Sequence, residues 1–109
     1  MPWSRRSLQL KELLTERILF LDGAMGTTLQ QRELSAEDFG GKAFEGCNEN
    51  LLRTRPDLVA EVHRDFLLAG ADIVETNTFG STALVLAEYG LAQRAREINR
   101  LGAEVARRV

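Results

Sequence analysis

Two short apolar runs, each ending in polar residues, constrain the fold more than any other feature of the sequence. The first covers residues 18–21 and stops at Asp22-Gly23, and the second covers residues 72–76 and runs into Asn77. Apolar runs of this length, bounded by turn residues, are typical of parallel strands that are buried on both faces. Because α/β proteins bind ligands at the carboxyl ends of such strands, the two polar tips predict one wall of a pocket.

Apolar residues at helical spacing predict five helices around these strands. The helices are expected to begin near residues 7, 25, 56, 82 and 92 and to end near residues 17, 31, 70, 89 and 108. The residues expected to face inward are Leu10, Leu13 and Leu14 in the first helix, and Ile98, Leu101 and Val105 in the last.

The third helix has the clearest boundary signals. Thr54 offers a capping hydroxyl, Pro56 suits the first helical turn, and Gly70 supplies the stop. Residues 33–50 lack periodicity and contain several Gly and Asn residues, so we expect a long excursion with little regular structure. Loops of this length are commonly lids, binding loops or disordered segments.

The order of these elements is helix, strand, excursion, helix, strand, helix. This βαβα pattern predicts an α/β fold with a parallel sheet and a right-handed crossover. A chain of 109 residues is the size of one small domain. Two parallel strands cannot complete a sheet, however, so we interpret the chain as the front of a larger domain whose strand edges stay open.

Composition excludes several classes of protein. The net charge of −2 provides no basic field for nucleic acid, and no lysine-rich run indicates an anionic membrane surface. The apolar runs are far shorter than the roughly 20 residues that span a bilayer. The single cysteine cannot form an intramolecular disulfide, which is typical of a cytoplasmic protein.

Polar residues at the two strand tips are the candidate ligand-binding groups. A carboxylate at the end of a buried strand needs a partner such as an amine or an N–H, although Asp22-Gly23 also makes a good turn. Gly23 and Gly26 would let backbone amides approach an anion. At the second tip, strand alternation predicts that the side chains of Thr76 and Asn77 point to opposite faces of the strand. Only one of these two faces is then expected to line the pocket. The alternative is a strand end that satisfies its own backbone.

Cys47 and His63 are not predicted to carry chemistry. Cys47 lies in a Gly/Asn-rich loop without a second ligand nearby, which indicates an incidental thiol. His63 lies inside the third helix, which indicates a histidine at the helix surface or at the edge of the core. One cysteine and one histidine cannot assemble a zinc site, which needs four ligands.

The two tips also carry recognisable motifs. Residues 21–27 (LDGAMGT) and 75–82 (ETNTFGST) resemble the homocysteine S-methyltransferase family, as do residues 46–51 (GCNENL) and 55–59 (RPDLV). More narrowly, they resemble the N-terminal homocysteine-binding module of the cobalamin-dependent methionine synthases. The resemblance covers nearly everything after about residue 10. It implies a (β/α)8 barrel of about 250 residues, of which residues 1–109 would be the leading helix plus two βα units.

The resemblance also implies a reaction, the transfer of a methyl group to the sulfur of homocysteine to make methionine. Zinc held by three cysteines on later strands, outside this chain, would keep that sulfur as a thiolate. Methylcobalamin, recharged from methyltetrahydrofolate on other modules, would donate the methyl group. Alternatives are a betaine- or S-methylmethionine-dependent enzyme, or a non-catalytic freestanding piece that binds a partner through its open edge. Without the zinc cysteines the isolated chain is expected to be inactive.

By the same resemblance, part of the homocysteine pocket is assigned to this chain. An acidic side chain suits the substrate ammonium, loop N–H groups suit its carboxylate, and a hydroxyl adds a hydrogen bond. The residues implied are Asp22, Gly23 and Ala24 for the amino-acid end, Thr76 for the added hydrogen bond, and Met25 and Asn77 for the lining.

Overall fold

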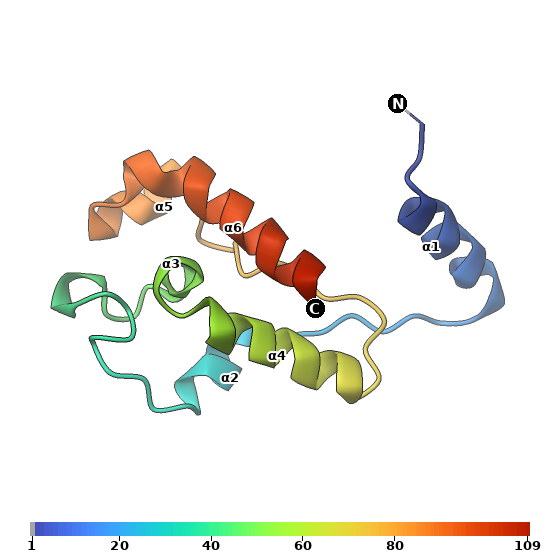
Figure 1. Ribbon diagram of the computed structural model, residues 1–109, viewed down its shortest axis with the longest axis horizontal. Helices are drawn as coiled ribbons and strands as arrows, with labels where there is room; N and C mark the ends of the chain where they lie inside the picture. The colour runs from blue at the N-terminus through green and yellow to red at the C-terminus, as the bar shows by residue number, and fades with distance from the viewer. Residues whose placement is uncertain (1) are drawn as a thin grey trace.

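The computed structural model describes residues 2–109, and in this range it consists of helices joined by extended segments and turns (Figure 1). The α-helices are α1 (Arg5–Glu16), α2 (Met25–Gln30), α3 (Leu51–Thr54), α4 (Pro56–Leu68), α5 (Ala83–Leu86) and α6 (Ala95–Arg108). Short 3₁₀ turns are η1 (Lys42–Phe44), η2 (Asn48–Asn50), η3 (Ala87–Tyr89) and η4 (Ala92–Arg94). All five predicted helices are present, the last two with a 3₁₀ turn at one end, and α3 is an addition.

The two predicted strands are present only as extended segments that meet at a single parallel bridge, between Leu21 and Ile73. Asp22 N donates to Ile73 O (3.0 Å), and Ile73 N donates to Phe20 O (3.2 Å). The prediction of regular strands over 18–21 and 72–76 is therefore wrong for the described residues, although their parallel direction is as expected. Within residues 2–109 each segment has a hydrogen-bonding neighbour on one side only, whereas a strand inside a parallel sheet has two.

A carboxylate clamp stabilises the start of this pairing. The guanidinium of Arg17 binds Asp72 through two hydrogen bonds of 2.7 and 3.0 Å, and Phe20 N donates to the same carboxylate at 3.0 Å. The Arg17 hydrogen bond, together with the Phe20 N–H, lowers the pKa of the Asp72 carboxyl to about 2. Side-chain bonds thus compensate for backbone bonds that the short pairing lacks.

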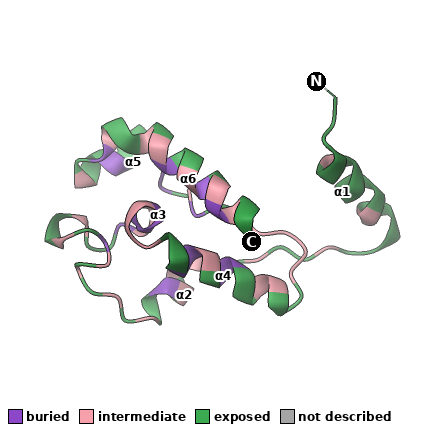
Figure 2. Cartoon of the chain, in the orientation of Figure 1, coloured by how far each residue is buried: buried purple, intermediate pink, exposed green. Residues whose placement is uncertain are grey.

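The core lies between α2, α3, α4 and α6, where the buried residues gather (Figure 2). Leu52 from α3, Val59 and Val62 from α4, and Ile98 and Val105 from α6 pack in one cluster. The inward face predicted for the last helix is therefore confirmed: Ile98 and Val105 are buried, and Leu101 packs against them. At the end of α4, the predicted stop is a glycine with φ of +113°, a left-handed conformation that a side chain would strain.

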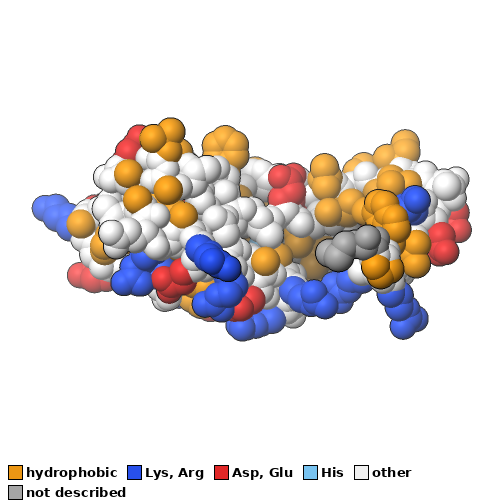
Figure 3. Space-filling view, turned by 90° about the horizontal axis from the view of Figure 1, so that it is seen from above, with side chains coloured by type: hydrophobic (Ala, Val, Ile, Leu, Met, Phe, Trp, Pro, Cys, Tyr) orange, Lys and Arg blue, Asp and Glu red, His pale blue; other side chains and the backbone are white. Residues whose placement is uncertain are grey.

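Helix α1 projects away from this core (Figures 1 and 2), and none of its residues is buried. The prediction that Leu10, Leu13 and Leu14 face inward is therefore wrong, because no other helix of the described chain covers them. In the space-filling view, hydrophobic side chains gather around this end of the molecule (Figure 3). The Cα radius of gyration is 15.3 Å, above the about 13 Å expected of a compact chain of this length. The molecule is an open arrangement with an uncovered apolar face.

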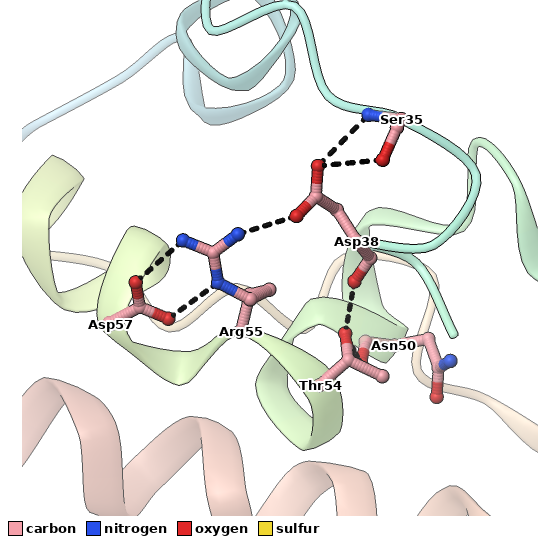
Figure 4. A network of polar contacts seen from close by, with 6 residues as sticks. All are labelled: Ser35, Asp38, Asn50, Thr54, Arg55 and Asp57. Carbon is pink, nitrogen blue, oxygen red and sulfur yellow. Dashed lines mark hydrogen bonds and ion pairs between the residues drawn. The ribbon is translucent and has the colours of Figure 1, made fainter. Parts of the chain in front are cut away.

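The excursion before α3 is held by a polar network (Figure 4). Asp38 accepts from Ser35 N (2.9 Å) and pairs with Arg55, whose guanidinium also binds both oxygens of Asp57. The Thr54 hydroxyl donates to Asp38 O (2.6 Å) instead of capping α4. The prediction of Thr54 as the cap is therefore wrong: Arg55 is the N-cap and makes no side-chain capping bond. As expected, the excursion has little regular structure.

Within residues 2–109, no helix combines the length and the apolar character needed to cross a membrane.

Candidate functional site

A cavity of about 140 Å³ lies where the two paired segments end. Its lining comprises Asp22, Gly23, Ala24, Met25, Glu75, Thr76, Asn77 and Phe79. The structure thus brings all six candidate residues together around one cavity and adds Glu75 and the fully exposed Phe79 to them. Their role in binding a ligand stays a prediction.

Asp22 joins the two tips. Its backbone N–H donates to Ile73 O (3.0 Å), and its Oδ1 accepts from Glu75 N (3.0 Å). The side chain is only 5% exposed, although the residue contributes to the cavity lining. The Asp22 carboxylate therefore accepts a hydrogen bond from the second segment. A simple Asp-Gly turn does not require such a bond, so the turn alone does not explain the aspartate at this position.

The loop that follows turns at an alanine. Ala24 has φ of 46° and ψ of 36°, the left-handed conformation, whereas neither Gly23 nor Gly26 has a positive φ. Gly26 already lies within α2, so the left-handed position of this turn falls on the alanine. A left-handed alanine costs about 1–2 kcal/mol, so the loop holds local strain beside the cavity.

The second tip departs from strand geometry. Thr76 and Asn77 both line the cavity, so the prediction that only one of the two faces contributes is wrong. Strict alternation applies to a pleated strand, and beyond Ile73 the segment turns, with Thr78 N donating to Thr76 O (2.9 Å). The hydroxyls of Thr76 and Thr78 are 2.6 Å apart and share a hydrogen bond. The amide of Asn77 is turned to the protein and donates to Asn48 O (3.0 Å).

The end of the excursion supports this tip. Gly80 N donates to Glu49 Oε1 (2.9 Å), and a Cβ atom at Gly80 would lie only 2.8 Å from that oxygen. Together with the bond from Asn77 to Asn48, this contact fixes the second tip to η2. Sequence reasoning missed both supporting residues, and the only signal for them was their place within the 46–51 motif.

The cysteine of this motif is part of the core. Cys47 is 1% exposed, and its Sγ lies 3.8 Å from Glu49 Oε2. Burial raises the pKa of the Cys47 thiol. The thiol therefore stays protonated near neutral pH, where a nucleophile or a metal ligand needs the thiolate.

His63 is a further residue that sequence reasoning missed. Its side chain is fully buried, so the expected place at the helix surface or core edge is wrong. Nδ1 lies 3.9 Å from Asp22 Oδ2, and neither ring nitrogen has a hydrogen-bond partner among residues 2–109. Burial lowers the pKa of His63, and the charge of Asp22 opposes this only in part. The available signal was its place four residues, about one helical turn, after the buried Val59.

The described residues do not fit a metal centre. No three His, Cys, Asp or Glu side chains within residues 2–109 are grouped so that they could hold an ion. The zinc implied by the family resemblance would have to take its ligands from residues outside this chain.

Comparison with known proteins assigns the family. The family model described as homocysteine S-methyltransferase matches residues 19–109. The chain belongs to the homocysteine S-methyltransferase family. The methionine synthase of Mycobacterium tuberculosis is 48% identical over 100 residues, and that of Mycobacterium leprae is 49% identical over the same length. Each match covers 92% of this chain and 8% of the relative, so the chain spans about 8% of the length of these proteins.

The region that matches the homocysteine S-methyltransferase family contains the whole cavity. Every lining residue falls between Leu19 and Val109, as do His63 and the supporting residues of η2. Helix α1 lies outside the match and also outside the packed core.

Proposed function

We propose that this cavity is part of the homocysteine site of a methyltransferase that makes methionine. One observation carries the proposal: the six residues that the family motifs indicate surround a single cavity. Two methionine synthases are 48% and 49% identical to this chain over 100 residues, which supports the choice of reaction.

The lining offers partners for both ends of an amino acid. The Asp22 carboxylate suits an ammonium, and although its Oδ1 already accepts from Glu75 N, a carboxylate has about four acceptor positions in total. Backbone N–H groups of Gly23 and Ala24 suit a carboxylate, and the Thr76 hydroxyl adds one hydrogen bond. A cavity of about 140 Å³ is smaller than the roughly 300–1,000 Å³ of complete ligand pockets. It would therefore form one wall, which later parts of the protein complete.

We further propose that the chain forms the leading helix and first two βα units of a (β/α)8 barrel. The parallel bridge between Leu21 and Ile73, with α4 in the connection, supports this arrangement. Ile18 and Phe20 are 79% and 63% exposed, as expected of strand residues that the rest of a barrel would cover. Hydroxyl-radical footprinting of the full-length protein tests the barrel. We expect both side chains to be protected, and labelling at the level of a free peptide would contradict it.

The cofactors of the full-length protein are part of the same proposal. Zinc ligands would come from residues outside this chain, and methylcobalamin, recharged from methyltetrahydrofolate, would serve as the methyl donor. A donor assay tests this choice. We expect the full-length protein to convert homocysteine to methionine with methylcobalamin as the donor. Turnover with betaine or S-methylmethionine alone would favour the alternative of a betaine- or S-methylmethionine-dependent enzyme.

Replacing Asp22 by Asn in the full-length protein tests the binding role directly. Loss of the charge opposite the ammonium should weaken homocysteine binding by roughly 1.5–3 kcal/mol, with the zinc content unchanged. Calorimetry measures the affinity, and Asp65→Asn, which removes an exposed carboxylate from α4, is the matched control. An Asp22→Asn protein that binds homocysteine as tightly as the wild type would refute the role given to Asp22.

A further inference from the structure

The buried imidazole of His63 needs an explanation beyond packing. It sits among the apolar side chains of α4 without exposure to solvent, and neither ring nitrogen has a partner in residues 2–109. A buried polar group without a partner carries its full desolvation cost. A leucine would fill similar space without that cost, so a histidine at this place indicates a use for an N–H.

The polar group that faces the imidazole is the carboxylate of Asp22. Oδ1 of Asp22 accepts from Glu75 N at 3.0 Å, whereas Oδ2 lies 3.9 Å from Nδ1 of His63 and has no hydrogen bond within residues 2–109. Both side chains are almost completely removed from solvent. The gap exceeds an N–H···O bond of about 2.9 Å by roughly 1 Å, and such bonds in empty active sites often shorten when ligand binds.

We propose that His63 is a positioning residue for Asp22, donating Nδ1–H to Oδ2 when homocysteine occupies the cavity. The carboxylate would then be held at both oxygens, by Glu75 N–H on one side and by the imidazole on the other. This inference rests on the proposed function, because Asp22 matters here only as the partner of the substrate ammonium.

The protonation state of the imidazole suits this task. A neutral histidine donates from one ring nitrogen and adds no charge. Burial keeps His63 in this neutral form by lowering its pKa. A neutral donor orients the Asp22 carboxylate and leaves its negative charge available to the ammonium, whereas a cation at the same place would compete with the substrate.

Three substitutions in the full-length protein test the proposal by calorimetry with homocysteine. His63→Leu removes the donor, His63→Asn places an amide N–H near the position of Nδ1, and His63→Gln places it near Nε2. We expect His63→Leu and His63→Gln to weaken binding roughly tenfold or more, and His63→Asn to stay within about threefold of the wild type. The His63→Leu effect should largely disappear in an Asp22→Asn background, since the donor then has no charged partner.

The outcomes separate the two proposals. A wild-type protein that does not bind homocysteine overturns the proposed function and, with it, the role of His63. A wild type that binds, together with a His63→Leu protein that binds equally well, overturns only the positioning role. If circular dichroism shows that His63→Leu does not fold, the Asn and Gln variants decide the question. Equal affinities of His63→Asn and His63→Gln for homocysteine would overturn the proposal, and a lower affinity of His63→Gln than of His63→Asn would support it.

Discussion

The substitution Gly102→Ala tests how closely α6 supports the second tip of the candidate site. Gly102 is buried, and a Cβ atom there would lie 2.5 Å from Thr78 Cγ2 and 3.3 Å from Leu52 Cδ1. Contacts below 3.0 Å between a Cβ and another heavy atom essentially never occur, so either α6 or the segment around Thr78 has to move. Leu52 presents a flexible side-chain end, and the decisive contact is therefore the one with Thr78.

The magnitude follows from what Thr78 would lose. Its side chain cannot rotate freely, because its hydroxyl shares a 2.6 Å hydrogen bond with Thr76. Overpacking costs about 1–3 kcal/mol, and the lost hydrogen bond costs about 0.5–1.5 kcal/mol. Alanine regains about 1 kcal/mol as the better helix former. We therefore expect a net loss of about 0.5–3.5 kcal/mol in the stability of this contact.

Hydrogen exchange measured by mass spectrometry on the full-length protein reports this loss locally. Amides of α6 and of residues 76–81 should exchange faster in Gly102→Ala, by about tenfold for each 1.4 kcal/mol. The matched rescue is Thr78→Ser, which removes the clashing Cγ2 and keeps the hydroxyl. Two results would refute the reasoning. One is hydrogen exchange in Gly102→Ala that is as slow as in the wild type, and the other is exchange in the double variant Gly102→Ala/Thr78→Ser that is as fast as in Gly102→Ala alone.

Three further predictions concern the segments around the cavity. Ala24→Gly should stabilise the protein by about 0.5–1 kcal/mol in thermal unfolding, since it relieves a left-handed alanine; destabilisation would contradict the strain. Because the pKa of Asp72 falls from 3.8 to about 2 on pairing with Arg17, its stabilisation is present above pH 3.8 and is lost towards pH 2. Unfolding curves should show this loss in the wild type relative to Asp72→Asn. Glu49→Ala should speed hydrogen exchange of the Gly80 amide roughly tenfold, because the acceptor of that amide is removed. Unchanged exchange would contradict the hydrogen bond between Gly80 and Glu49.

Local signals in the sequence were sufficient for the helices. Apolar periodicity located each main helix, and Pro56 and Gly70 marked the two ends of α4, because both residues act through their own backbone geometry. Thr54 shows where such signals stop. A hydroxyl before a helix can cap it, but here the carbonyl of Asp38 takes the hydroxyl, and no local pattern could reveal that contact.

Periodicity also identifies an apolar face without identifying what covers it. Leu10 and Leu14 have the spacing of a packed helix, yet they are 38% and 58% exposed. The same limit applies to the strands: apolar runs predict strands at 18–21 and 72–76, but within residues 2–109 the two segments pair only at the bridge between Leu21 and Ile73. The candidate site was more accessible to prediction, because strand-end chemistry and two motifs led to six residues that do share a cavity.

The residues that sequence reasoning missed have a common position, behind the lining of the cavity. His63 faces the carboxylate of the first tip, Glu49 binds the backbone of the second, and Gly102 lets α6 approach it closely. Each belongs to a different segment and contacts the site across a long stretch of chain, so its sequence neighbours do not reveal that contact. The two tips are therefore held in place by contacts within these 109 residues. In the proposed function, contacts within residues 2–109 would therefore arrange most of this wall of the pocket.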